Sequence, residues 1–132
     1  MIEPFLSAFV QWASGQADIV AVALAGSHAR GTAKSSSDVD LLILTSDPGR
    51  YLADTGWARR FGPVDREQLE DWGRVTSVRV WYRDWQEVEF GFTTPDWAAE
   101  PIDEGTRRVI RGGMRVLFDR EEYLSSAIGE SG

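Results

Sequence analysis

Two short apolar runs, joined by a glycine-serine turn and a polar connector, constrain the fold of this chain more than any other feature. The first run, residues 19–24, is rich in β-branched residues, and the second, residues 41–44, reads LLIL. Such runs are typical of strands that are buried on both faces of a sheet. We therefore expect strands over residues 19–24 and 38–45 that are neighbours in one sheet, with a short helix over residues 27–33 between them.

Two aspartates, Asp38 and Asp40, stand at the start of the second run. Because side chains alternate along a strand, the two carboxylates share a face and repel each other. Either one of them stays protonated or a cation lies between them, and Mg²⁺ fits because it prefers oxygen ligands. Gly26 and Ser27 open the expected helix, where free backbone N–H groups favour an anion such as phosphate. The alternative is a pair of capping or solvated aspartates.

The stretch GSHARGTAKSSSDVDLLIL, residues 26–44, joins Gly-Ser to Asp-x-Asp through ten intervening residues. This pattern resembles the signature of the DNA polymerase beta-like nucleotidyltransferase superfamily. Its fuller form is similar to the small bacterial branch, which includes the minimal nucleotidyltransferase antitoxins and the nucleotide-transferring domain of aminoglycoside-modifying enzymes. The close match covers residues 19–44. The resemblance implies an α/β (α+β) nucleotidyltransferase fold, with a small mixed sheet flanked by helices.

The resemblance also implies the residues of the site. The catalytic and metal-binding carboxylates would be Asp38, Asp40 and Glu89, with Mg²⁺ as the cofactor and two ions expected when an NTP is bound. The nucleotide-binding residues would be Gly26, Ser27, Arg30, Gly31 and Ser37. Glu89 is preferred as the third carboxylate because apolar residues flank it, and Glu87 is the alternative; both also suit a solvated hairpin face. Gly31 also suits simple helix punctuation, and Arg30 also suits bracing an acid.

The remaining elements follow from periodicity and turn signals. We expect helices over residues 3–14, 51–61, 65–71, 96–100, 106–111 and 120–128, and strands over 75–82, 86–92 and 114–118. Residues 83–84 should form a tight hairpin turn between two of these strands. Alternation then places Glu87 and Glu89 on one face of the hairpin, with Arg79 on the same face.

The chain has 132 residues, a net charge of −7 and no cysteine. Its length predicts one domain over residues 1–132. The acidic balance makes nucleic acid an unlikely partner, and the lack of cysteine excludes disulfides and thiolate metal sites. We find no apolar run of about 20 residues for a membrane and no basic leader, so we expect a cytoplasmic protein without a membrane partner. The resemblance implies a bacterial source.

The resemblance implies transfer of a nucleoside monophosphate from Mg-NTP to a hydroxyl of a small-molecule or protein acceptor. AMP is the nucleoside monophosphate that the resemblance favours. The alternative is an antitoxin-like or nucleotide-sensing binding module with little or no catalysis. The expected partners are ATP and an unidentified acceptor, with a toxin-like protein or a second copy of the chain as further partners. The helical acceptor-binding domain of aminoglycoside enzymes has no counterpart in these 132 residues.

Overall fold

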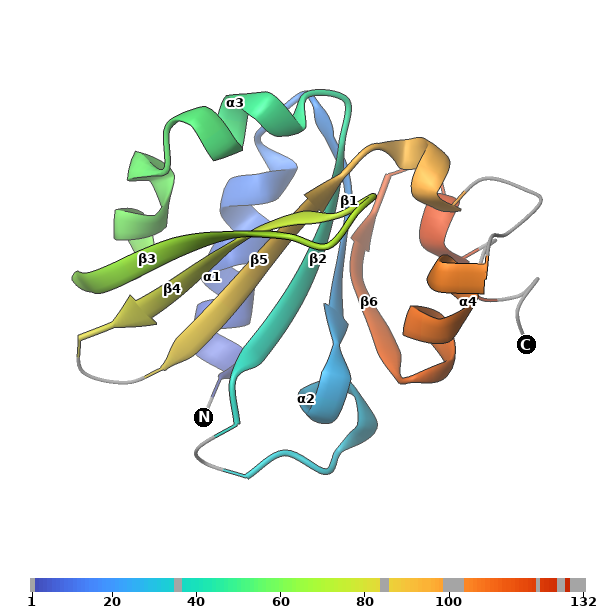
Figure 1. Ribbon diagram of the computed structural model, residues 1–132, viewed down its shortest axis with the longest axis horizontal. Coiled ribbons are helices and arrows are strands. Elements are labelled where there is room, and N and C mark those ends of the chain that lie inside the picture. The colour runs from blue at the N-terminus through green and yellow to red at the C-terminus, as the bar shows by residue number, and fades with distance from the viewer. Residues whose placement is uncertain are drawn as a thin grey trace.

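The computed structural model describes residues 2–34, 37–83, 86–98, 104–120, 122–125 and 128. Within this part of the chain, one six-stranded sheet runs in the order β3-β4-β5-β2-β1-β6 (Figure 1). The strands are β1 (Ile19–Ala25), β2 (Val39–Thr45), β3 (Val64–Asp71), β4 (Thr76–Tyr82), β5 (Glu87–Thr93) and β6 (Met114–Asp119). The helices are α1 (Glu3–Ser14), α2 (Gly26–Arg30), α3 (Pro48–Ala53) and α4 (Glu104–Arg111), with 3₁₀ turns η1 (Gly56–Phe61) and η2 (Pro95–Ala98).

The sheet is mixed. β1 and β2 pair antiparallel, as do β4 and β5, whereas β2 and β5 pair parallel. The expected α/β class with a small mixed sheet and flanking helices is therefore confirmed, and the two apolar runs are neighbouring central strands. No helix in the described ranges has the length and apolar character needed to cross a bilayer.

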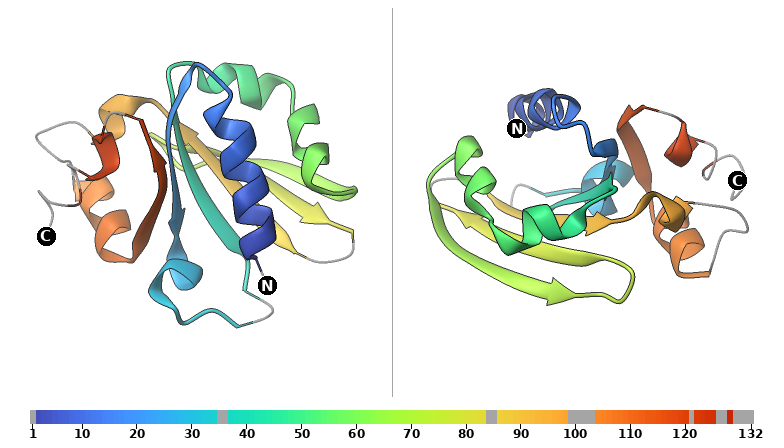
Figure 2. Two further views of the ribbon diagram at one scale, coloured as in Figure 1. Left: turned by 180° about the vertical axis from the view of Figure 1, so that it is seen from behind. Right: turned by 90° about the horizontal axis from the view of Figure 1, so that it is seen from above.

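The sheet has an apolar face and a mixed face, and Figure 2 shows α1 on one side of it and α4 on the other. Alternation in β2 sends Val39, Leu41 and Ile43 toward α1, where Phe9 and Phe90 are fully buried in an aromatic-rich core. This packing explains the 12-residue helix α1, because Phe5, Leu6, Phe9 and Ala13 recur at helical spacing along its buried side.

The opposite face carries a smaller core and the polar residues of the motif. Leu42 and Leu44 of β2 pack there with Trp97 of η2 and Leu124. Asp40 precedes them on the same face of β2 by alternation. The sheet therefore presents acids at one end of this face and apolar side chains at the other.

The structure differs most from the sequence prediction at residues 65–71, which form strand β3 and not a helical turn. The segment is almost wholly exposed, so it shows no apolar alternation, and its Arg, Glu, Gln and Leu residues favour helix. Pairing with β4 along the whole strand overrides that propensity. The Trp72 N–H donates to the Val75 carbonyl at 2.8 Å and closes the connecting turn.

Two further helix predictions need correction. The helix expected over residues 51–61 is split into α3 and η1, because Asp54 is extended and its carboxylate accepts the Gly56 N–H. Helix α4 begins at Glu104, so Thr106 is not its cap; the buried Thr106 hydroxyl donates to the Trp97 carbonyl instead. Residue 84 of the expected turn at 83–84 and parts of the helices over 96–100 and 120–128 lie outside the described ranges.

Candidate active site

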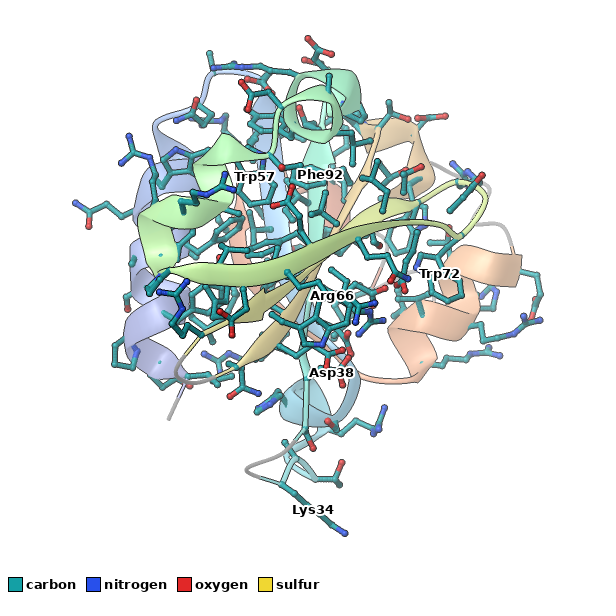
Figure 3. The ribbon with its side chains drawn as sticks, turned by 60° about the vertical axis from the view of Figure 1, so that its left-hand side comes forward. Lys34, Asp38, Trp57, Arg66, Trp72 and Phe92 are labelled. Atoms are coloured by element: carbon teal, nitrogen blue, oxygen red, sulfur yellow. The ribbon has the colours of Figure 1, made fainter. Side chains whose placement is uncertain are left out.

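Carboxylates from separate strands meet on the mixed face of the sheet. Asp40 of β2 lies directly across from Glu89 of β5 in the parallel pairing, and Ala25 of β1 lies on its other side. Asp38 lies just before β2, and Arg79 donates to both Asp38 and Glu89 (Asp38 is labelled in Figure 3). Sequence alternation thus anticipated the face, and the β2–β5 register brings Glu89, not Glu87, level with Asp40.

Arg79 of β4 binds this acidic cluster from the adjacent strand. Its guanidinium donates to Asp38 and Glu89 at 3.1 Å each and to Glu87 at 2.5 Å, and its Nε donates to Glu70 at 3.1 Å. Its side chain is only 17% exposed. Although burial lowers the pKa of Arg79, its bonds to Glu87 and the other acids raise that pKa above the ordinary value, so the guanidinium stays charged.

Asp40 and Glu89 remain difficult to ionise together. Burial raises the pKa of Asp40 to about 7, with Asp38 and Glu89 adding repulsion. Burial also raises the pKa of Glu89 above its ordinary value, although the positive charge of Arg79 opposes that shift. The indole Nε1 of Trp72 donates to the Glu89 carboxylate at 3.0 Å. Near neutral pH, the pair of carboxylates therefore either keeps a proton or is stabilised in its ionised form by an additional positive charge.

We predict that the buried Asp40 carboxyl makes the metal-free protein less stable as the pH rises. Its folded-state pKa of about 7 exceeds the ordinary 3.8, so between these values the folded chain holds a proton that the unfolded chain has lost. Its contribution is present near pH 4 and is lost as the pH approaches 7. Urea unfolding in EDTA at about pH 5 and about pH 8 should show a smaller loss for Asp40→Asn than for wild type. Equal losses in the two proteins would contradict the assignment.

The Gly-Ser turn packs directly against Asp40. Gly26 has a φ of +71°, and a Cβ at this position would lie 2.5 Å from the Asp40 carboxylate. Glycine is therefore required both by the backbone conformation and by the close approach. Ser27 follows in α2, and Gly31 ends the helix with a φ of +75° while its N–H donates to the Ser27 carbonyl. The short helix thus starts beside the acids, as the sequence predicts.

Arg30 and Ser37 make structural contacts. Arg30 Nη1 donates to the Gly112 carbonyl at 2.6 Å, and its aliphatic stem packs so closely on Gly113 that a Cβ there would lie 2.4 Å away. The Ser37 hydroxyl accepts the Lys34 N–H at 2.9 Å. Figure 3 shows the Lys34 side chain pointing away from Asp38. Arg30 braces the turn between α4 and β6 in this arrangement, and phosphate contacts of Arg30 and Ser37 stay predictions.

The donor set suits a hard divalent cation by chemistry. Among the described residues, no group of three or more His, Asp or Glu side chains is arranged to hold a metal ion. Asp38, Asp40 and Glu89 nevertheless offer only oxygen ligands, which Mg²⁺ prefers. A cation beside Asp40 would relieve the repulsion that raises its pKa. The chemistry of these residues therefore fits Mg²⁺, although Arg79 already donates to Asp38 and Glu89.

A cavity of about 350 Å³ adjoins the acids. Asp40 and Glu89 line it together with Trp72, Trp97 and Val109. Sequence reasoning missed Trp72 and Glu70 because the segment that carries them was predicted as helix. The sequence signal for the turn between β3 and β4 is Gly73. Its φ of +83° is a conformation that glycine adopts readily.

The sequence and the fold of this chain both resemble those of known nucleotidyltransferases. The sequence model of a family described as nucleotidyltransferase domain matches residues 6–88, which is more than half of the chain. Among solved structures, the crystal structure of an aminoglycoside 6-adenyltransferase from Bacillus subtilis is similar, with a TM-score of 0.55 and 16% identity. The match covers 68% of this chain and 34% of that one, so this chain spans about a third of the other. At that identity the likeness shows the fold alone. No curated protein matched the sequence.

Proposed function

Because the chain belongs to the nucleotidyltransferase domain family, we propose that it transfers a nucleoside monophosphate from an NTP to a hydroxyl of an acceptor. The observation that carries the proposal is the convergence of Asp38, Asp40 and Glu89 on one face, with Gly26 packed against Asp40. Carboxylates beside a helix start are the parts that a metal-bound triphosphate needs.

We propose that the Gly26-Ser27 turn, Asp38 and Asp40 bind the nucleotide. The backbone of Gly26 and Ser27 would receive the terminal phosphates, with Gly31 leaving open space at the other end of α2. Asp38 and Asp40 would hold Mg²⁺, and Glu89 would either complete the set of ligands or act on the acceptor. When bound, Mg²⁺ supplies positive charge for the developing pyrophosphate.

Glu89 is proposed to act on the acceptor. The acceptor oxygen attacks the α-phosphorus, the bond from that phosphorus to the bridging oxygen breaks, and pyrophosphate leaves with the electron pair. The proton of the hydroxyl passes to the Glu89 carboxylate and then to water, so the product is a phosphodiester. Trp72 orients Glu89 through its 3.0 Å hydrogen bond. The raised pKa of Glu89 brings its basicity closer to what a general base needs.

We propose ATP as the donor and AMP as the transferred group. The fold neighbour is named as an adenyltransferase, and the Gly-Ser and Asp-x-Asp motif resembles the same branch. The test is incubation of the protein with ATP labelled on the α-phosphate, Mg²⁺ and a panel of hydroxyl compounds and proteins. Label should move to an acceptor with release of pyrophosphate, and Glu89→Gln should reduce the rate by about 10²–10⁴-fold. Equal rates with Glu89→Gln would exclude it as the base.

One observation favours a second candidate, a nucleotide-sensing or antitoxin-like binding module. Arg79 already binds Asp38, Glu87 and Glu89, so it compensates part of the negative charge of the site without a metal. Magnesium-dependent ATP binding without any label transfer would favour a sensor. Neither binding nor transfer would favour a module that works through a protein partner or a second copy of the chain.

A further inference from the structure

The cavity beside Glu89 is distinct from the Gly26-Ser27 turn that is proposed to bind the phosphates. Its wall includes Asp40, Glu89 and Ala25, whereas Gly26 and Ser27 are not among its described lining residues. Gly26 nevertheless packs on the Asp40 carboxylate, so Asp40 contacts the turn and also faces the cavity. A phosphorus atom held near Asp40 would therefore have the turn on one side and the cavity on the other. A volume of about 350 Å³ is within the range of small-molecule sites.

The wall beyond the two acids is largely apolar. Leu42 and Val75 contribute aliphatic surface, and Trp72, Trp97 and Val109 contribute from the β3–β4 turn, η2 and α4. Figure 3 shows Trp72 between the end of that hairpin and α4. Trp72 is 61% exposed, which is unusual for the largest apolar side chain, and its indole is fixed by Glu89. An exposed, fixed indole offers a flat surface for a ring.

The few polar groups on the wall are largely satisfied within the protein. The Thr106 hydroxyl donates to the Trp97 carbonyl at 2.9 Å, and Arg74 lies 3.8 Å from the Asp96 carboxylate. Only the Asp40 and Glu89 end therefore carries negative charge toward a ligand. A compound with several ammonium groups would find carboxylates only at the Asp40 and Glu89 end. Its other charges would lie beside the Arg74 guanidinium and aliphatic surface, at a desolvation cost.

We infer that this cavity is the acceptor site and that it takes an uncharged alcohol or phenol with a flat apolar body, with its hydroxyl at Glu89. The inference rests on the proposed nucleotidyl transfer and names its acceptor class. The hydroxyl oxygen forms the new bond to the α-phosphorus, its proton goes to Glu89, and pyrophosphate leaves with the electrons of the broken bond. The apolar body lies against Trp72 and Val109, which hold the oxygen in place.

Binding of 2-naphthol tests the inference without any turnover. In ¹⁵N-labelled protein, the indole resonance of Trp72, assigned with Trp72→Phe, should shift saturably on addition of 2-naphthol. Val109→Phe places a larger side chain at the cavity wall and should weaken this binding by at least about tenfold. The matched control is Arg108→Phe, one residue away on the exposed part of the same helix, which should bind as wild type does.

Competition separates the acceptor from other occupants. Binding of 2-naphthol should persist when the site is saturated with Mg²⁺ and α,β-methylene-ATP. Displacement by that analogue would assign the cavity to the nucleobase and overturn the inference. A shift with the polycation kanamycin but not with 2-naphthol would overturn it too, as would no shift with either. Label transfer to an acceptor that fails to bind here refutes the cavity assignment alone, whereas 2-naphthol binding without any label transfer refutes the transferase alone.

Discussion

Replacing Asp38 and Asp40 together by asparagine is expected to abolish magnesium-dependent ATP binding while the fold stays intact. The Asp40 carboxylate packs against the turn, and burial and the nearby Asp38 raise its pKa. Loss of both removes the charge that attracts Mg²⁺, a contribution of several kcal/mol, so affinity should fall by at least about a hundredfold. Isothermal titration of ATP with Mg²⁺ and with EDTA measures this directly.

The melting temperature of the double variant should equal or exceed that of wild type in EDTA. Asparagine keeps the side-chain shape and removes the repulsion between the acids. The control is Asp65→Asn, an exposed aspartate of β3 paired with Arg83 on the surface, which should change neither ATP binding nor melting appreciably. ATP binding by the double variant at wild-type strength would refute the metal assignment.

Replacing Arg79 by methionine is expected to lower the free energy of unfolding by about 3–5 kcal/mol near neutral pH without metal. The change keeps most of the aliphatic stem but leaves Asp38, Glu70, Glu87 and Glu89 without their shared counter-charge. Repulsion among these carboxylates then favours proton uptake by the folded chain over proton uptake by the unfolded chain. Stability should return as the pH falls to about 4 and below, where the carboxylates of the unfolded chain also become protonated.

Urea unfolding across this pH range, with and without Mg²⁺, measures the effect of Arg79→Met. Mg²⁺ should restore part of the lost stability, because it supplies charge to the same acids. Arg115→Met is the matched control, since Arg115 forms only an exposed pair with Glu3 at 3.4 Å and should cost less than about 1 kcal/mol. A similar, pH-independent loss in both variants would show that Arg79 contributes packing and not charge neutralisation.

The parts of the fold that the sequence predicted are those with local signals. The two apolar runs identified β1 and β2, and helical spacing identified α1 with its observed ends. Alternation placed Glu89 and Arg79 on one face of the β4–β5 hairpin, as their pairing confirms. Each of these inferences needs only neighbouring residues.

The rest depended on contacts between distant segments. Nothing local favours a strand at 64–71, whose charged residues are exposed; only its pairing with β4 fixes it there. Because strand β3 was not predicted, two residues of the site were not predicted either. These are Glu70, which accepts from Arg79, and Trp72, which donates to Glu89. The parallel register that sets Asp40 level with Glu89 joins strands separated by the whole of α3, η1, β3 and β4. No spacing in the sequence encodes that register.

The parallel pairing of β2 with β5 determines when, during folding, Asp40 and Glu89 come together. Antiparallel hairpins can close early because their halves are adjacent in the chain, but β2 meets β5 only after a long loop has closed. The acids therefore face each other only once the central sheet is complete. Under the proposed function, Glu89 joins Asp40 and the Gly-Ser turn only at this stage, so nucleotidyl transfer would require the completed sheet.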